Sequence, residues 1–198
     1  MEQKPRIYVY KMTMDNGGAP CVHNNLLSLA ICKPQIRRMA EEGSIIFGFG
    51  GREYGLRLIY IAKITKKLLE GEYYRDDAGY TNRSDCIYEF ETDEKTAKRK
   101  AKAIYHKPDD LEHDVGKDFK KGHVLLSHCF RYFGKKGSCD YIKYSHIKKL
   151  VEGMGRAYRV NHSCKLCSEL LCLKAEMWEN PTKIQGAPTS PDKGKRCW

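Results

Sequence analysis

Two kinds of side chain in this sequence have the chemistry that recognises a nucleotide. Aromatic rings stack on the flat faces of bases, and cationic side chains contact phosphate oxygens through charge-assisted hydrogen bonds. The aromatic candidates are Tyr8, Tyr10, Phe49, Tyr60 and Tyr132. The cationic candidates are Lys33, Arg37, Arg38, Arg52 and Arg57. Together they predict a pocket with aromatic walls and a basic rim that binds a base or a nucleotide.

The elements that would position these side chains begin with a strand at residues 6–12. Alternation along that strand puts Tyr8 and Tyr10 on one face. A short basic helix follows, because Pro34 suits a first helical turn and Gly43 suits a helix end. Adjacent positions on a helix point about 100° apart, so at most one of Arg37 and Arg38 faces the pocket, and Arg37 is our candidate.

The remaining wall comes from two strands after Gly43. The first breaks near Gly48, where a residue without a side chain lets another group approach the backbone. The second, at 56–66, is apolar on both faces and is therefore predicted to be central. Asp15, in the turn DNGGAP, either accepts a hydrogen bond from a base amino group or holds its own turn, and the second use is the commoner one.

The same segments carry a family resemblance. RIYVYKMTMDNGGAP, LAICKPQIRRMAEEG, LIYIAKIT and HVLLSHCFRYFG occur in this order within roughly the first 135 residues. In order and spacing they resemble the second type of nucleotide-modification-associated domain, found in bacteria and their viruses. The chain departs from that pattern at Ser44, where Asp is expected, and in a compressed region at 83–123. The resemblance implies a module that recognises a nucleotide or modified base and works with the partner proteins of a DNA-modification or defence system.

The fold class predicted is α+β, because short strands mix with helices without regular alternation. We expect a small, partly open β-barrel flanked by helices, similar at the fold level to PUA and EVE domains. The expected domain spans 1–160, a C-terminal helix spans 161–178, and 179–198 is a disordered tail rich in Pro, Gly and Lys. Further helices are expected at 94–104, capped by Asp93, and at 144–154.

Composition limits the partners and the compartment. The 198 residues carry a formal net charge of +11 and nine cysteines. The charge favours phosphate-bearing partners such as nucleotides or DNA. No apolar run reaches the length of a membrane span and no signal peptide is evident, so we expect a cytoplasmic protein with reduced thiols and no membrane contact. Lys95, Arg99 and Lys102 share one face of the expected helix, which either follows a phosphate backbone or is a solvated surface.

Metal binding and catalysis have weaker signals. His162, Cys164 and Cys167 include a Cys-x-x-Cys half-site, but no second half-site is present, so no metal or other cofactor is predicted. Ser127 and His128 are neighbours on a strand and face opposite ways, which excludes a hydrolase pair.

The cluster formed by His106, His113, Asp114 and His123 either binds a metal or transfers protons, or its histidines are ordinary surface loop residues, and the last use is the commoner one. Catalysis is therefore not required by the sequence. The leading prediction is a recognition module. An enzyme that modifies bases or nucleotides, and a protein that sequesters a small nucleotide signal, remain the alternatives.

Overall fold

The computed structural model describes residues 5–155 and 157–189. Its main sheet has five strands in the order β10-β5-β4-β1-β11. These strands are Cys129–Tyr132 (β10), Leu58–Lys63 (β5), Ile45–Gly50 (β4), Ile7–Met12 (β1) and Tyr158–Arg159 (β11). β1 runs parallel to β4, and the other pairs are antiparallel. β5 lies inside the sheet and is buried on both faces, as its apolar sequence predicts.

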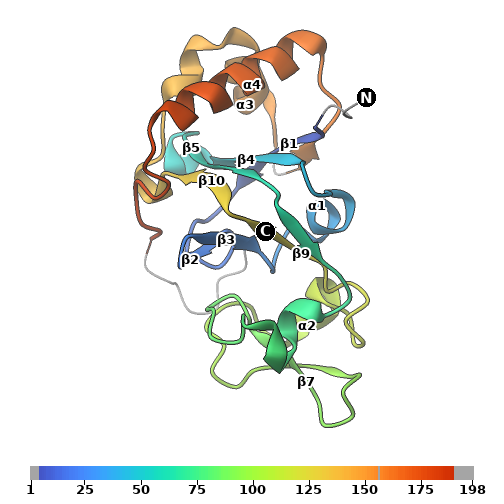
Figure 1. Ribbon diagram of the computed structural model, residues 1–198. Coiled ribbons are helices and arrows are strands. Elements are labelled where there is room, and N and C mark those ends of the chain that lie inside the picture. Colours follow the sequence, from blue (N-terminus) through green and yellow to red (C-terminus); the bar gives the residue numbers. More distant parts are fainter. Residues whose placement is uncertain (1–4, 156, 190–198) are drawn as a thin grey trace.

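Two helices cover one face of this sheet (Figure 1). They are Ser145–Gly153 (α3) and Cys164–Glu179 (α4), close to the predicted bounds, and the Ser163 hydroxyl caps α4 by accepting from the Leu166 N–H. Ile147 and Leu170 pack there against Val9 and Phe47. Alternation along β1 sends Tyr8 and Tyr10 to the opposite face, into a second core.

That second core is closed by a four-stranded sheet in the order β2-β3-β9-β6. Its strands are Cys21–His23 (β2), Leu26–Leu29 (β3), Val124–Ser127 (β9) and Lys66–Leu68 (β6). The chain passes from one sheet to the other at Ser127, whose hydroxyl donates to the Lys63 carbonyl at this corner. The α+β class is confirmed. The described strands form separate sheets and no closed barrel, so the expected PUA-like barrel is not confirmed.

The middle of the chain forms a lobe beside the four-stranded sheet (Figure 1). It contains the short helix Leu111–Asp114 (α2) and the hairpin of Tyr88–Phe90 (β7) with Ala97–Arg99 (β8). The helix expected at 94–104 is wrong. The Asp93 carboxylate accepts from the backbone N–H groups of Lys95 and Thr96, which closes a turn and starts β8.

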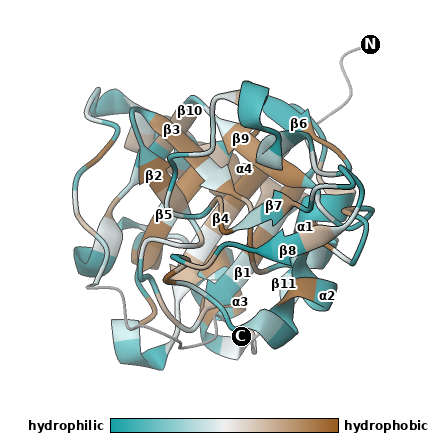
Figure 2. Cartoon of the chain, turned by 90° about the horizontal axis from the view of Figure 1, so that it is seen from below, coloured by the Kyte–Doolittle hydropathy of each residue, from teal (hydrophilic) through white to brown (hydrophobic). Residues whose placement is uncertain are grey.

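The basic helix after Pro34 is confirmed as Pro34–Met39 (α1). The described part of the expected tail is ordered against the body: Tyr132 donates its N–H to the Lys183 carbonyl and accepts from the Gln185 N–H. Residues 190–198 lie outside the described residues. Apolar positions concentrate on the central strands and polar ones on the surrounding segments (Figure 2). Nowhere in 5–155 or 157–189 does a helix have both the length and the apolar character of a membrane span.

Candidate active site

Four of the five predicted aromatic residues meet in the core between the two sheets. Tyr8, Tyr10, Tyr60 and Tyr132 are each at most 2% exposed. The hydroxyls of Tyr10 and Tyr60 lie 2.9 Å apart, and the Tyr8 hydroxyl donates to the Met39 carbonyl at 2.8 Å. A Cβ at Gly48 would lie 2.2 Å from the Tyr60 ring. The close approach predicted for Gly48 therefore comes from the protein's own tyrosine.

Asp15 belongs to the same interior. Both of its carboxylate oxygens accept from the Tyr132 hydroxyl, at 3.0 and 2.8 Å. Burial raises the pKa of Asp15 to about 6. Lys33 places its ammonium 5.1 Å from the centre of the Tyr10 ring. Phe49 and Arg57 lie elsewhere: Phe49 packs on Tyr141 beneath the helices, and Arg57 is exposed.

Arg37 is fully buried and does not point to solvent. Its guanidinium donates to the carbonyl oxygens of Cys32, His123 and Asp114 at 2.7–2.8 Å. It also lies 3.8 Å from the Asp114 carboxylate. The planar donors of Arg37 thus join the start of α1 to the lobe that carries α2.

Beside Arg37, three side chains form a thiol, imidazole and carboxylate series. The Cys32 sulfur lies 3.1 Å from His106 Nε2. The other ring nitrogen, Nδ1, is hydrogen bonded to Asp114 Oδ2. Tyr88 donates to the same oxygen at 2.7 Å, and the Cys32 N–H donates to Asp114 Oδ1 at 3.3 Å. This is the order of groups in a Cys-His-Asp catalytic triad.

The charge on Asp114 fixes the roles of the ring nitrogens. Burial by itself would raise the pKa of Asp114, but the hydrogen bond from His106, together with Arg37 and Tyr88, holds it below its ordinary value. The ionised carboxylate only accepts hydrogen bonds, so His106 Nδ1 is the donor. His106 Nε2 is then positioned to accept the proton of the Cys32 thiol.

The backbone of this triad is strained. Cys32, Lys33 and His106 have φ values of 58°, 45° and 56°, in the left-handed region. Such a conformation costs free energy for a residue with a side chain and occurs preferentially at functional sites. Two of the three triad members, Cys32 and His106, are therefore held in a sparsely populated backbone conformation.

The interpretation of the clustered histidines as surface loop residues is wrong for His106, which is 2% exposed and lies beside the fully buried Asp114. His113 is exposed and His123 is half-buried. Spacing along the chain gives no signal for the triad, because Cys32 lies 74 residues before His106.

The residues of the predicted basic face and the candidate metal ligands lie in ordinary structural environments. Lys95 and Lys102 are exposed, whereas Arg99 donates to carbonyl oxygens of its own loop, including Ala103 and His106. His162 is hydrogen bonded to the Ile7 carbonyl. Within the described residues, no three His, Cys, Asp or Glu side chains are grouped to hold a metal ion.

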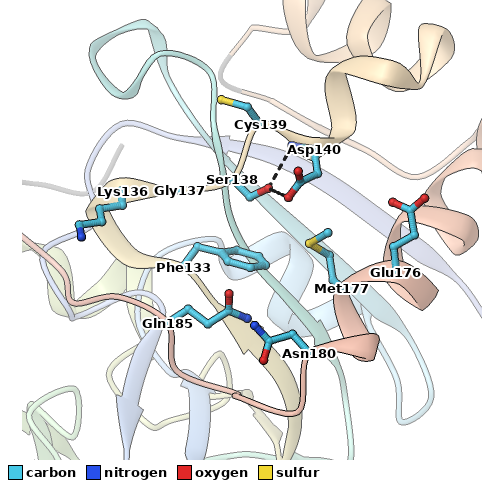
Figure 3. A pocket seen from close by; sticks show the side chains of 10 residues that line it. All are labelled: Phe133, Lys136, Gly137, Ser138, Cys139, Asp140, Glu176, Met177, Asn180 and Gln185. Atoms are coloured by element: carbon cyan, nitrogen blue, oxygen red, sulfur yellow. Dashed lines mark hydrogen bonds between the residues drawn. The ribbon is translucent and has the colours of Figure 1, made fainter.

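Open cavities occur away from the triad. One of about 420 Å³ lies between the end of β10, the end of α4 and the tail (Figure 3). Phe133, Asn180 and Gln185 line one side of it, and Ser138, Asp140 and Glu176 line the other.

Comparison with known families identifies the chain. The family model described as nucleotide modification associated domain 2 matches residues 4–188. The chain belongs to that family. Cys32, His106 and Asp114 lie within this range, which extends the nucleotide modification associated domain beyond residue 135 into the tail. No curated protein and no solved structure matches the chain.

Proposed function

We propose that this nucleotide modification associated domain is an enzyme that modifies a base or nucleotide by covalent catalysis, with Cys32 as the nucleophile. The observation that carries the proposal is the contact of the Cys32 sulfur with His106 Nε2, in a ring held by Asp114. The family supports a role in nucleotide modification. Among the enzyme and recognition alternatives, the triad favours the enzyme.

The chemistry that suits this arrangement is acyl transfer. Cys32 gives its proton to His106 Nε2, and its sulfur bonds to the carbonyl carbon of an ester-class donor, whose alcohol leaves with that proton. An amino or hydroxyl group of the nucleotide then attacks the thioester carbon. Its proton passes through His106 to the departing sulfur, which restores the thiol. Asp114 keeps the imidazole oriented and stabilises its charged form.

Access to the site requires movement. Cys32 is 1% exposed, so a substrate reaches the sulfur only after the surrounding segments separate. His106 lies between β8 and α2, outside both sheets. Opening of this connection would expose Cys32 and closing would reassemble the triad around the substrate, as lids do in other enzymes.

The proposal is tested with p-nitrophenyl acetate as an acyl donor and peptide mass spectrometry to locate the acyl group. We expect acylation of Cys32 that falls by about 10²–10⁴-fold in His106→Gln. Cys139→Ser is the matched control, because Cys139 is exposed and lies outside the triad. Acylation of Cys32 at an equal rate with and without His106, or of Cys139 alone, would overturn the proposal.

A second measurement connects the triad to nucleotides. Nucleosides from cells that express the chain, with or without Cys32→Ser, are compared by mass spectrometry. A modified nucleoside that depends on Cys32 supports the enzyme. Binding of nucleotides without any such product, and with an inert Cys32, would instead favour the recognition module.

A further inference from the structure

A cleft of about 540 Å³ opens on the side of the five-stranded sheet away from the tyrosine core. It lies where the end of β1, the 3-10 helix Arg52–Tyr54 (η1) and the end of α3 meet. Its lining residues are Lys11, Met12, Thr13, Gly51, Arg52, Glu53, Glu152, Gly153, Met154 and Gly155. Lys11 follows Tyr10 in β1, so its side chain points away from Tyr60 and the triad.

Lys11 is the unusual member of this cleft. The residue is only 9% exposed. That burial covers its hydrocarbon stem, whereas the Nζ atom itself still reaches the open space of the cleft. No hydrogen bond or ion pair joins the Lys11 ammonium to any residue of 5–155 or 157–189. Its ammonium group, at the cleft wall, is thus available to a ligand.

A second cation faces the same space. Burial, and after it the charge of Arg52, lowers the pKa of Lys11. Arg52 is exposed and, over the described residues, likewise has no ion pair or side-chain hydrogen bond. Glu53 and Glu152 also line the cleft, but among the described residues no ion pair joins either of them to Lys11 or Arg52. Two cations held close together repel, and an anion between them removes that repulsion.

The small residues of the cleft leave room for such an anion. A Cβ at Gly153 or Gly155 would have no atom within 4 Å. A tetrahedral oxyanion offers several acceptor oxygens, and arginine presents a planar set of donors while lysine acts as a point charge.

From this arrangement we infer that Lys11 and Arg52 form a phosphate-binding site. The site is separate from Cys32 and does not depend on the proposed acyl transfer. Its ligand is a phosphate group, supplied either by a free nucleotide or by the backbone of a nucleic acid. Two of the cations that make the protein basic would thus bind phosphate at one defined place.

The test measures binding by calorimetry at fixed low ionic strength with three probes: inorganic phosphate, a deoxynucleoside monophosphate, and a single-stranded oligonucleotide without terminal phosphates. Lys11→Met and Arg52→Gln should each weaken binding of at least one probe by about 10- to 100-fold. Arg57→Gln is the matched control, since it removes an exposed arginine and the same unit of charge outside this cleft. It should leave the affinity unchanged.

The probes separate the two sources of phosphate. Tight binding of the monophosphate with weak binding of the oligonucleotide indicates a free nucleotide, and the reverse indicates the backbone. The inference is overturned if no probe binds, or if Lys11→Met and Arg52→Gln bind every probe as Arg57→Gln does. Cys32→Ser should retain full phosphate affinity, because Cys32 lies outside the cleft. Failure of the acyl-transfer proposal would therefore leave phosphate binding intact, and the two failures can be told apart.

Discussion

The buried charged side chains in the core between the two sheets differ in how their charges are compensated. Arg83 donates to the hydroxyls of Tyr73 and Ser28 and lies 3.5 Å from Asp85. Asp114 has His106 and Arg37 beside it. Asp15 has the hydroxyl of Tyr132 and no ion-pair partner among the described residues. The charge of Asp15 is therefore less compensated than those of Asp85 and Asp114, which gives it a distinct dependence on pH.

The first prediction concerns Asp15. Its pKa is about 6 in the folded protein and near 4 when unfolded, so the folded state binds the proton more tightly. The contribution of protonated Asp15 to the free energy of unfolding is complete below about pH 4 and is lost as pH rises through 6. Relative to the wild type, Asp15→Asn should gain stability between these values, up to about 3 kcal/mol, because two pKa units correspond to this free energy. Urea unfolding of both proteins at pH 4.5 and 7.5 measures the difference, and an equal difference at both values would contradict the assignment.

At the scale of single elements, the packing of α1 depends on one guanidinium. Arg37 holds the carbonyl before the helix, the end of α2 and the segment before β9 together. Its neighbour Arg38 is exposed. The two arginines thus have the same side chain and nearly the same place in the sequence, but different environments.

Arg37→Ala should destabilise the protein by about 3–5 kcal/mol, because it leaves buried acceptors and the Asp114 carboxylate without their donor. Arg38→Ala should change the free energy of unfolding by about 0.5 kcal/mol or less. Chemical denaturation of the pair provides the comparison. Equal losses for the two variants would show that Arg37 does not have this joining role.

A similar pair of variants tests the contact between β4 and β5. A methyl group at Gly48 would meet the Tyr60 ring, whereas Gly153 at the end of α3 has open space. Gly48→Ala is expected to cost about 1–3 kcal/mol through overpacking. Gly153→Ala should be close to neutral. Thermal unfolding distinguishes them, and a neutral Gly48→Ala would mean that Tyr60 moves aside freely.

Strands and helices with strong patterns were predictable from the sequence. The alternation at 6–12, the apolar run at 56–66 and the helix start at Pro34 all follow from local chemistry. The structure of the segment 94–104 was not predictable from the sequence, because pairing of β8 with β7 overrides the helix propensity of its Lys and Ala residues. The site also escaped prediction: the aromatic and basic side chains are present, but only the fold shows that Arg37 binds carbonyl oxygens and that Cys32 meets His106.

At the scale of the whole molecule, the C-terminal segment after α4 returns across the body. Lys135 donates its N–H to the Ala187 carbonyl, and Thr189 donates both its N–H and its hydroxyl to the Asp15 carbonyl. A Cβ at Gly134 would lie 2.4 Å from the Ala187 oxygen. Residues from opposite ends of the chain are thereby joined near Asp15.

Deletion of residues 181–198 should therefore lower the melting temperature by several degrees, since these backbone hydrogen bonds are lost together. Deletion of 190–198 alone leaves every described contact in place and should change the melting temperature little. Calorimetry on the two truncated proteins separates them. An unchanged melting temperature for the longer deletion would show that the segment adds no stability.

The hydrogen bonds of Tyr132 with residues 183 and 185 have a consequence for solubility. β10 is an edge strand of the five-stranded sheet, and the exposed N–H and C=O groups of an edge strand are a template for pairing with another chain. The C-terminal segment occupies the N–H and C=O groups of Tyr132, the last residue of β10. It thus protects this edge from pairing with another chain. A protein shortened to residue 180 should therefore form dimers and larger aggregates through β10 at concentrations where the full chain stays monomeric.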